Sequence, residues 1–260
     1  MIQDLHSHTY YSICGKDDPH VMIEAAIAGG IELFGLSDHN HGIAVRRPND
    51  FRKGQEGDCY RDYFDYLTLL KEEYKDRITI LRDIELCTLH DHRALVLPDG
   101  ADVSYYDYAL IECLGEKDSI LGNDLFSYAK RVGCYCGLAH TDMFGYIRSI
   151  GEDPETYFRR MAEANIFWEM NVNYDSIHGW RELAYVKRFF ESEEQQEIIR
   201  RSGVKLSIGF DGHRIEDYLP ERIRKYCLML EHLGLPMAFS EYFENAGKRG
   251  VSSDIKSDFK

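Results

Sequence analysis

The segment Asp4-Leu5-His6-Ser7-His8-Thr9 places two histidines two residues apart, directly after the first apolar residues of the chain. Side chains at positions i and i+2 of a strand point to the same face, so both imidazoles can reach one point at a strand end. Neutral imidazole is a common ligand of zinc, manganese and iron. Two solvated histidines would give the same spacing, so the rest of the chain must decide whether this is a metal site.

Short apolar segments rich in Ile, Leu, Val and Phe alternate with longer amphipathic ones along the chain. We expect strands over 2–5, 31–36, 78–86, 134–139, 166–172 and 204–209, with strand character also at 93–97 and 105–114. We expect helices over 19–29, 59–76, 120–132, 154–164, 180–202 and 216–233, and a loop over 40–57. Strand–helix alternation predicts an α/β fold with a parallel sheet and outer helices. Six or seven such units favour a barrel over an open sheet, in a single domain spanning 1–260 with a frayed tail from about residue 248.

Composition narrows the class of protein. The chain has 260 residues and 44% hydrophobic residues, enough for a full core, and no apolar run approaches a membrane span. Its N-terminus lacks the features of a signal peptide, and its seven cysteines are scattered without zinc-finger spacing. We therefore expect a cytoplasmic protein with no membrane partner. The net charge of −14 disfavours an extended nucleic-acid footprint but allows a small anionic substrate.

Polar residues of the metal-binding type recur where the expected strands end. In a parallel barrel all these ends meet on one face, where active sites are built. Scattered histidines would not follow that rule, so a shared metal site is the favoured interpretation. The residues are His6 and His8, then Asp38 and His39, Glu85, His140, Glu169 with Asn171, and finally Asp211 and His213.

Such a set of ligands suits hydrolysis. Histidines with shared carboxylates can hold two or three divalent ions, and a water bridging two ions becomes a hydroxide nucleophile near neutral pH. The same ions neutralise a phosphate and stabilise the charge on its oxygens. The sequence has no Walker loop, dinucleotide-binding glycine fingerprint or Gly-x-Ser-x-Gly elbow to indicate other chemistry.

The ordered motifs resemble those of the polymerase and histidinol phosphatase (PHP) family, from residue 2 to about residue 215. They are His6-Ser7-His8-Thr9, Ser37-Asp38-His39, Glu85, His140-Thr141-Asp142 and Asp211-Gly212-His213, and His140-Thr141-Asp142 is most similar to the histidinol phosphatase branch. The resemblance implies a distorted (β/α)7 TIM-like barrel, a metal centre of two or three ions (Zn, Mn or Fe) and phosphoester hydrolysis.

The resemblance also implies roles for single residues. One ion would be held by His6, His8, Glu85 and Asp211. Glu85 would bridge to a second ion that His140 also binds, and His39 with His213 would hold a third. The candidate catalytic groups are Asp38, from the same resemblance, and His178, from its place in the loop after the strand expected over 166–172. Asp38 would orient a ligand or nearby backbone, and Asp142 could act similarly, whereas His178 could protonate the leaving alcohol or be a surface residue.

The sequence departs from the family pattern in two places. Family members usually carry a histidine in the slot that falls here at about Leu114; Glu112 either substitutes for it or only pairs with a cation. The third ion often has a further ligand shortly after the first motif, where Cys14 stands here. Cys14 is either a thiolate ligand, which would favour zinc, or an ordinary buried cysteine.

Phosphate recognition needs cations on the same face. Arginine suits this role through its bidentate fork. The candidates in loops after strands are Arg148 and Arg214, and also Arg46 and Arg47.

We therefore expect a metal-dependent phosphatase acting on a small phosphomonoester, histidinol phosphate being the family precedent. Two alternatives stay open: a phosphodiesterase or exonuclease acting on nucleotides or oligonucleotides, and a metal-binding module without catalysis. Metal-dependent amidohydrolases also use H-x-H at a first strand, but they typically need a lysine that bridges their ions or a further pair of histidines. Glu85 takes the bridging place here, which favours phosphoester chemistry. The sequence gives no oligomeric state.

Overall fold

The computed structural model describes residues 1–46, 58–89, 96–122 and 124–241. The strands are β1 (Gln3–Asp4), β2 (Leu33–Leu36), β3 (Thr79–Arg82), β4 (Glu85–Leu86), β5 (Ala109–Ile111), β6 (Cys136–Leu138), β7 (Ile166–Asn171) and β8 (Leu206–Gly209). The helices are α1 (Pro19–Ala28), α2 (Asn40–Arg46), α3 (Cys59–Tyr74), α4 (Leu125–Val132), α5 (Met143–Ser149), α6 (Pro154–Glu163), α7 (Ala184–Glu191), α8 (Glu193–Ser202) and α9 (Pro220–His232), with a 3₁₀ turn η2 (Ile215–Asp217).

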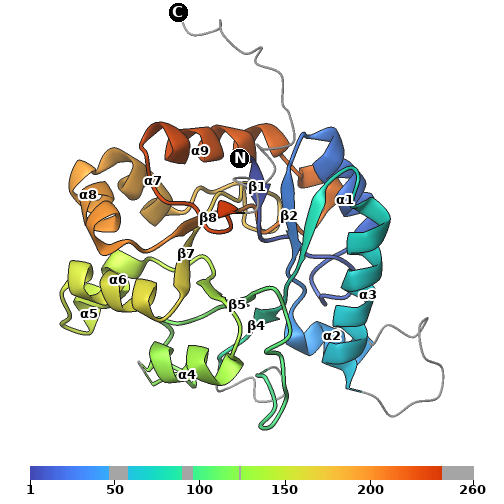
Figure 1. Ribbon diagram of the computed structural model, residues 1–260, viewed down its shortest axis with the longest axis horizontal. Coiled ribbons are helices and arrows are strands. Elements are labelled where there is room, and N and C mark those ends of the chain that lie inside the picture. The colour runs from blue at the N-terminus through green and yellow to red at the C-terminus, as the bar shows by residue number, and fades with distance from the viewer. Residues whose placement is uncertain (47–57, 90–95, 123, 242–260) are drawn as a thin grey trace, which may run out of the picture.

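Every pairing between these strands is parallel, and the strands form two sheets of order β1-β2-β3 and β4-β5-β6-β7-β8. Helices surround the strands, with α1 to α3 on one side and α5 to α8 on the other (Figure 1). The α/β class predicted from the alternation is confirmed. Parallel strands buried on both faces explain why the segments are apolar runs rather than alternating ones.

Backbone hydrogen bonds connect the two sheets at both seams. At one seam Leu5 N donates to Ile208 O (2.9 Å) and Ser7 bridges to Gly212. At the other, Glu85 N donates to Asp38 O (3.1 Å), so the end of β2 reaches β4. The ladder is not one continuous sheet, and the closed sevenfold barrel stays a prediction.

The strand expected over 78–86 divides into β3 and β4. The chain changes partner at Asp83 and Ile84: β3 pairs with β2, whereas β4 pairs with β5. Taken as one interrupted strand, these two leave seven strand segments in the described part of the chain. This break sets Glu85 between the two sheets.

Helix starts follow local chemistry. Asp18, Asp58 and Asp153 each accept a backbone N–H bond in the first turn, and Pro19 and Pro154 occupy the first helical position. These residues satisfy or avoid the unpaired N–H groups of a helix start, which is why the starts at residues 19, 59 and 154 were predictable.

Other boundaries were wrong. Residues 40–46 form helix α2 rather than loop, and 47–57 lie outside the described residues. The helix expected over 180–202 is two, since Ser192 caps α8 by accepting from Gln195 N (3.2 Å). Helix α5 was not expected, and the last helix begins at Pro220 after a 3₁₀ turn.

One large cluster of buried side chains, from Ile2 to Met237, fills the space between strands and helices. A second contains Leu5, Leu33, Leu81, Tyr108 and Phe167 together with other side chains that the two sheets enclose. In the segments that the structure places, every helix is too short or too polar to cross a bilayer. The predicted tail from residue 248 and residues 93–95 of the expected strand character lie outside the described residues.

Candidate metal centre

Four side chains from three separate segments meet at the carboxyl ends of the strands. His6 and His8 follow β1, Glu85 begins β4, and Asp211 follows β8. His6 Nε2 lies 3.1 Å from His8 Nε2, 3.3 Å from Glu85 Oε1 and 3.5 Å from Asp211 Oδ1. His8 Nε2 lies 3.0 Å from the same Asp211 oxygen and 3.5 Å from Glu85 Oε2. The sequence placed these residues in one shell, and the fold brings them together.

These distances fit a bound ion. Ligand atoms about 2.1 Å from a tetrahedral zinc are separated by about 3.4 Å, the range seen between these nitrogens and oxygens. All four residues are buried. Each offers a nitrogen or oxygen lone pair toward the same point, so the donor set and its spacing suit a divalent metal.

Glu85 connects this group with two further histidines. Its Oε1 lies 3.2 Å from His140 Nε2, and its Oε2 lies 2.9 Å from His39 Nδ1. The second pair is close without hydrogen-bond alignment, so Glu85 Oε2 and His39 Nδ1 are buried atoms lacking a hydrogen-bond partner among the described residues. Glu112 Oε1 approaches the same His39 nitrogen at 3.7 Å. Buried polar atoms that lack a hydrogen-bond partner are costly unless a cation binds them.

The expected slot at Leu114 is apolar. Leu114 is buried in the large core cluster, whereas Glu112, two residues earlier, forms a candidate ligand group with His39 and Glu85. His140 groups with His6 and Asp211 as well as contacting Glu85. Of the two readings of Glu112, the geometry therefore favours a metal-facing carboxylate.

Charges in the cluster shift one another's pKa. Burial raises the Glu85 pKa, but His39 and His6 outweigh burial and hold it well below its usual value. Burial lowers the His6 pKa, and Glu169 and Glu85 more than reverse this. Burial and the charge of Glu85 raise the Glu112 pKa to about 8. The buried carboxylates therefore need positive charge close to them. Protonated histidines provide it when no metal is bound, and divalent ions can replace those protons.

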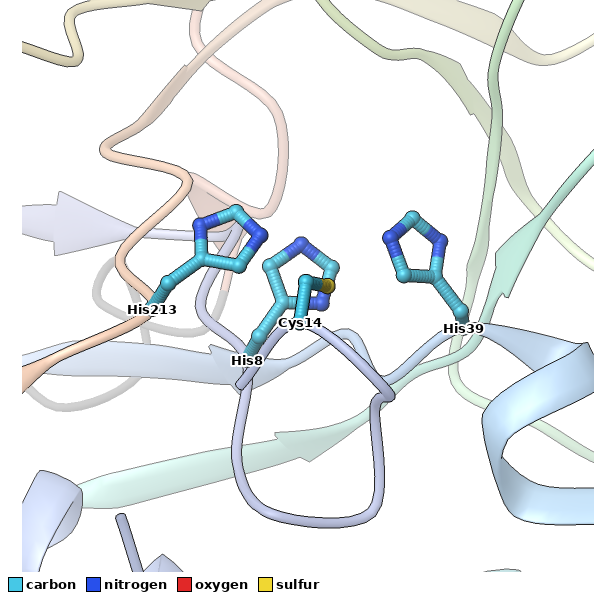
Figure 2. A group of neighbouring side chains, drawn as sticks. All are labelled: His8, Cys14, His39 and His213. Atoms are coloured by element: carbon cyan, nitrogen blue, oxygen red, sulfur yellow. The ribbon is translucent and has the colours of Figure 1, made fainter. Parts of the chain in front are cut away.

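A third group consists of His8, Cys14, His39 and His213, each offering an atom within 4.8 Å of the others. Figure 2 shows the Cys14 sulfur between the rings of His213 and His39, with His8 beside it. Partial desolvation raises the Cys14 pKa, but hydrogen bonds with His213 and His39 outweigh it and lower the pKa to about 7.

Carboxylates behind the ligands orient them. Glu169 Oε1 lies 2.7 Å from His6 Nδ1, and Glu169 Oε2 accepts from the backbone N–H of His140 (2.6 Å). This arrangement fixes the ring nitrogen that His6 turns toward the cluster. The sequence placed Glu169 at a strand end but gave it no role; its position two residues before Asn171 on an otherwise apolar strand was the available indication.

Asp38 is fully committed to hydrogen bonds. Its carboxylate accepts from Thr9 N (2.7 Å), Thr9 Oγ1 (2.6 Å), Ser12 N (3.0 Å), Ser12 Oγ (2.6 Å) and Tyr63 OH (2.7 Å). Ser12 Oγ in turn lies 3.0 Å from His8 Nδ1 and accepts from His39 N (2.9 Å). Asp38 thus positions His8 and the His39 backbone, in agreement with the orienting role that the resemblance implied.

Two candidate ligands have unusual backbone conformations. His140 has φ 32° and Asp211 has φ 57°, in the left-handed region that non-glycine residues seldom adopt. Such conformations persist where surrounding contacts hold them and are common at functional sites. For His140, the contact is the hydrogen bond from its N–H to Glu169.

His178 lies at the edge of the cluster. Its Nδ1 and its backbone N each lie 2.8 Å from Asp175 Oδ1, and its Nε2 lies 3.4 Å from Asp211 Oδ2. The hydrogen bond with Asp175 raises the His178 pKa despite partial burial. Of the two readings of His178, this geometry favours a side chain that faces the site.

Two of the arginines predicted to bind phosphate, Arg148 and Arg214, form no hydrogen bond or ion pair with the candidate metal ligands within the described ranges. Arg214 follows His213, and its Nε is buried with no hydrogen-bond partner among the described residues. Arg148 is exposed, with its guanidinium 5.9 Å from the centre of the Phe144 ring. Arg46 ends α2, and Arg47 lies outside the described residues. Asp142 accepts from Gly145 N (3.0 Å) and pairs with Arg188, so it caps α5 instead of supporting a ligand.

Comparison with known proteins places the chain. The fold is similar to that of a histidinol phosphate phosphatase from Lactococcus lactis subsp. lactis Il1403, solved with zinc, L-histidinol and phosphate: TM-score 0.53 and 16% identity over 90% of this chain and 94% of that one. A Listeria monocytogenes protein provisionally described as a histidinol phosphatase gives a TM-score of 0.43 and 14% identity over 83% of this chain and 96% of that one. At such identities these likenesses concern the fold alone. A search of curated protein sequences gave no significant match. The PHP domain pattern matches residues 4–233, and the chain therefore belongs to the PHP domain family, a family of metal-dependent phosphoesterases.

Proposed function

We propose that this protein is a metal-dependent phosphatase that hydrolyses a small phosphomonoester. The observation that carries the proposal is the convergence of His6, His8, Glu85 and Asp211 with ligand atoms 3.0–3.5 Å apart at the carboxyl ends of the strands. Divalent ions held there would neutralise the phosphoryl oxygens and lower the pKa of the attacking water.

The protein's own groups have separate tasks in this proposal. Glu169 and Ser12 hold the rings of His6 and His8 through Nδ1, so each Nε2 faces the cluster. Glu85, buried among four histidines, is the carboxylate placed to be shared between two ion positions. His140 and Glu112 would complete the ligands of a second ion, so these residues would hold two ions.

His178 is the proposed proton donor to the leaving alcohol. Asp175 engages its Nδ1 and backbone N–H, which turns Nε2 toward Asp211 and the open side of the cluster. An imidazole oriented in this way can deliver a proton to an oxygen that leaves phosphorus. Arg214 and Arg148 are the proposed phosphate-binding cations. Arg214 is favoured because its buried Nε has no hydrogen-bond partner in the part of the chain that the structure describes.

The substrate class follows from charge and from the neighbouring fold. A net charge of −14 opposes binding of a long polyanion but not of a compact monoester dianion held by ions and an arginine. Histidinol phosphate is the first ester to test, because the Lactococcus lactis enzyme with a similar fold was solved with L-histidinol and phosphate.

The test is phosphate release by purified protein from a panel of esters, each with Mn²⁺, Zn²⁺ or Fe²⁺. We expect turnover of small monoesters that a chelator abolishes and added metal restores. Activity that persists after complete metal removal would refute the proposal. Stepwise shortening of labelled single-stranded DNA would instead support a nuclease, and full metal loading without turnover on any ester would support a non-catalytic metal-binding module.

A further inference from the structure

Cys14 lies in the candidate centre but outside the ligands of the two ions considered under the proposed function. Its sulfur and one nitrogen each of His8, His39 and His213 lie within 4.8 Å of one another (Figure 2). The family resemblance implies a third ion held by His39 and His213; we propose that in this chain Cys14 adds a thiolate ligand to that position and makes it selective for thiophilic ions such as zinc over manganese. This inference rests on the proposed function in one respect only, namely that the neighbouring groups bind metal.

The assignment of three ligands follows from what His8 already contacts. His8 Nδ1 faces Ser12 Oγ at 3.0 Å, and its Nε2 faces Asp211 and Glu85 at 3.0 and 3.5 Å. Its Nδ1 is therefore engaged by Ser12, and its Nε2 belongs to the first group. His39 turns Nδ1 toward Glu85 (2.9 Å), which leaves Nε2 for the side of Cys14.

The loop that carries Cys14 is held in place at both ends. Tyr10 N donates to Asp17 O (2.8 Å), which closes the loop on itself. Lys16 N donates to His213 O (3.1 Å), and Ile215 N donates to Asp17 Oδ2 (2.8 Å), which joins the loop to the segment of His213. Backbone hydrogen bonds therefore fix the position of the Cys14 loop relative to the segment that contains His213.

Gly15 permits this close packing. A Cβ at position 15 would lie 1.9 Å from the carbonyl oxygen of Thr9, so only glycine allows the chain to turn back there. The turn directly follows Cys14 and directs that residue over the strand ends. A pre-arranged loop of this kind lowers the ordering cost of binding an ion.

Sulfur sets the metal preference. Thiolate is a soft ligand that binds zinc well and manganese poorly, and imidazole suits zinc equally. Three protein ligands leave one tetrahedral position open, the arrangement of zinc sites that admit a substrate or water. When the ion binds, the sulfur–metal bond replaces the S–H bond and the proton passes to solvent.

The test uses metal-free full-length protein titrated with Co²⁺ and followed by absorption. We expect a near-ultraviolet thiolate-to-cobalt charge-transfer band in the wild type and in Cys134→Ser, whose cysteine lies before β6 at the opposite end of the strands. Cys14→Ser should lose the band, and its zinc affinity at this position should weaken by about 10-fold or more, since even outer-shell changes cost that much. Cys14→His should bind cobalt without the band.

A second measurement uses only the wild-type protein, so it tests Cys14 as a metal ligand even if a variant fails to fold. Zn²⁺ should slow modification of Cys14 in the wild type by a thiol reagent, read by peptide mass analysis, whereas Mn²⁺ should not. A band that survives in Cys14→Ser, or cobalt that binds the wild type without any band, overturns the proposal. Ester hydrolysis without the band would refute only the thiolate site, and the band without hydrolysis would refute only the phosphatase.

Discussion

Glu169 shows how a single residue outside the metal shell controls the ligands. It faces His6 Nδ1 with one oxygen and accepts from the His140 backbone with the other, so one carboxylate sets the orientation of two candidate ligands. Asn171 Nδ2 donates to the same carboxylate at 3.3 Å. Buried, multiply bonded carboxylates of this kind act on metal affinity through the imidazole they hold.

Replacing Glu169 by Gln should therefore lower metal affinity or activity by about 10- to 100-fold with little loss of fold. Glutamine keeps the shape but presents either a neutral acceptor or an N–H that opposes the His6 ring. Elemental analysis after dialysis against a weak chelator measures the effect. Glu163→Gln, on the exposed surface of α6, is the matched control. Unchanged metal content in Glu169→Gln would contradict the orienting role.

Replacing His178 by Asn tests whether this residue donates a proton to the leaving group, if esters with different leaving groups are compared. Alkyl phosphates leave as poor alkoxides and need the proton, so their kcat should fall by about 100-fold or more. p-Nitrophenyl phosphate leaves as a stable anion and should be affected far less. His232→Asn, exposed at the end of α9, is the control. Equal losses on both esters would assign His178 a different role.

Strand β8 contributes to the site by a residue that has no side chain. A Cβ at Gly209 would lie 2.0 Å from Glu169 Oε1 and 2.6 Å from His6 Cβ, so the two can meet only across glycine. Gly209→Ala should separate them and weaken metal binding by about 10-fold, as loss of the orienting contact would. Gly115→Ala is the control, because its nearest neighbour would be an ordinary 3.7 Å away. Zinc titration of both variants measures the difference.

Asp107, two residues before β5, connects α3 with β3 through hydrogen bonds. It accepts from Arg82 Nη2 (2.7 Å), Arg82 Nε (3.0 Å), Arg82 N (2.9 Å) and Lys71 Nζ (3.0 Å). Burial raises the Asp107 pKa, but the bonds from Arg82 outweigh it and leave the pKa lowered. Its stabilisation is therefore present above the unfolded-state pKa and is lost as the pH falls through the folded-state pKa.

Asp107→Asn should lower the free energy of unfolding at pH 7 by about 1.5–3 kcal/mol, the range for hydrogen bonds to a charged group. The loss should shrink toward acid pH, where the wild-type carboxyl is protonated as well. Urea unfolding at pH 7 and at low pH measures this. Asp99→Asn, which removes an exposed pair with Arg131, should have little effect at either pH. A pH-independent loss would contradict the electrostatic account.

At the scale of the whole molecule, the candidate metal centre lies between segments that the backbone alone connects weakly. The candidate ligands at the ends of β1 and β8 and at the start of β4 lie on both sides of the two seams between the sheets. An ion bound at this cluster would hold both sheets together, beyond the few backbone bonds that cross each seam.

Metal removal should accordingly destabilise the fold. An ion at 100 times its Kd stabilises by about 2.7 kcal/mol if it binds only the folded chain, and such a change shifts Tm by about 5 °C or more. Thermal unfolding with chelator, then with Zn²⁺ or Mn²⁺ restored, measures the shift. Glu85→Gln should abolish most of it. A Tm independent of metal would contradict an ion at the seams.

The sequence by itself determined the α/β class and the set of candidate ligands, because hydrophobic periodicity and side-chain chemistry are local properties. The helix starts at Pro19 and Pro154 could also be predicted from the sequence, because the capping residue acts within one turn of the helix start. Helix α5 and the break at Ser192 were not, because short helices are set by what they pack against.

Only the tertiary structure decided which ligand atoms meet. That Glu85 lies between His6, His140 and His39, that Glu169 stands behind His6, and that Cys14 reaches His213 depend on contacts between residues far apart in the chain. Such distances follow from the packing of whole strands and loops. No spacing in the sequence encodes them.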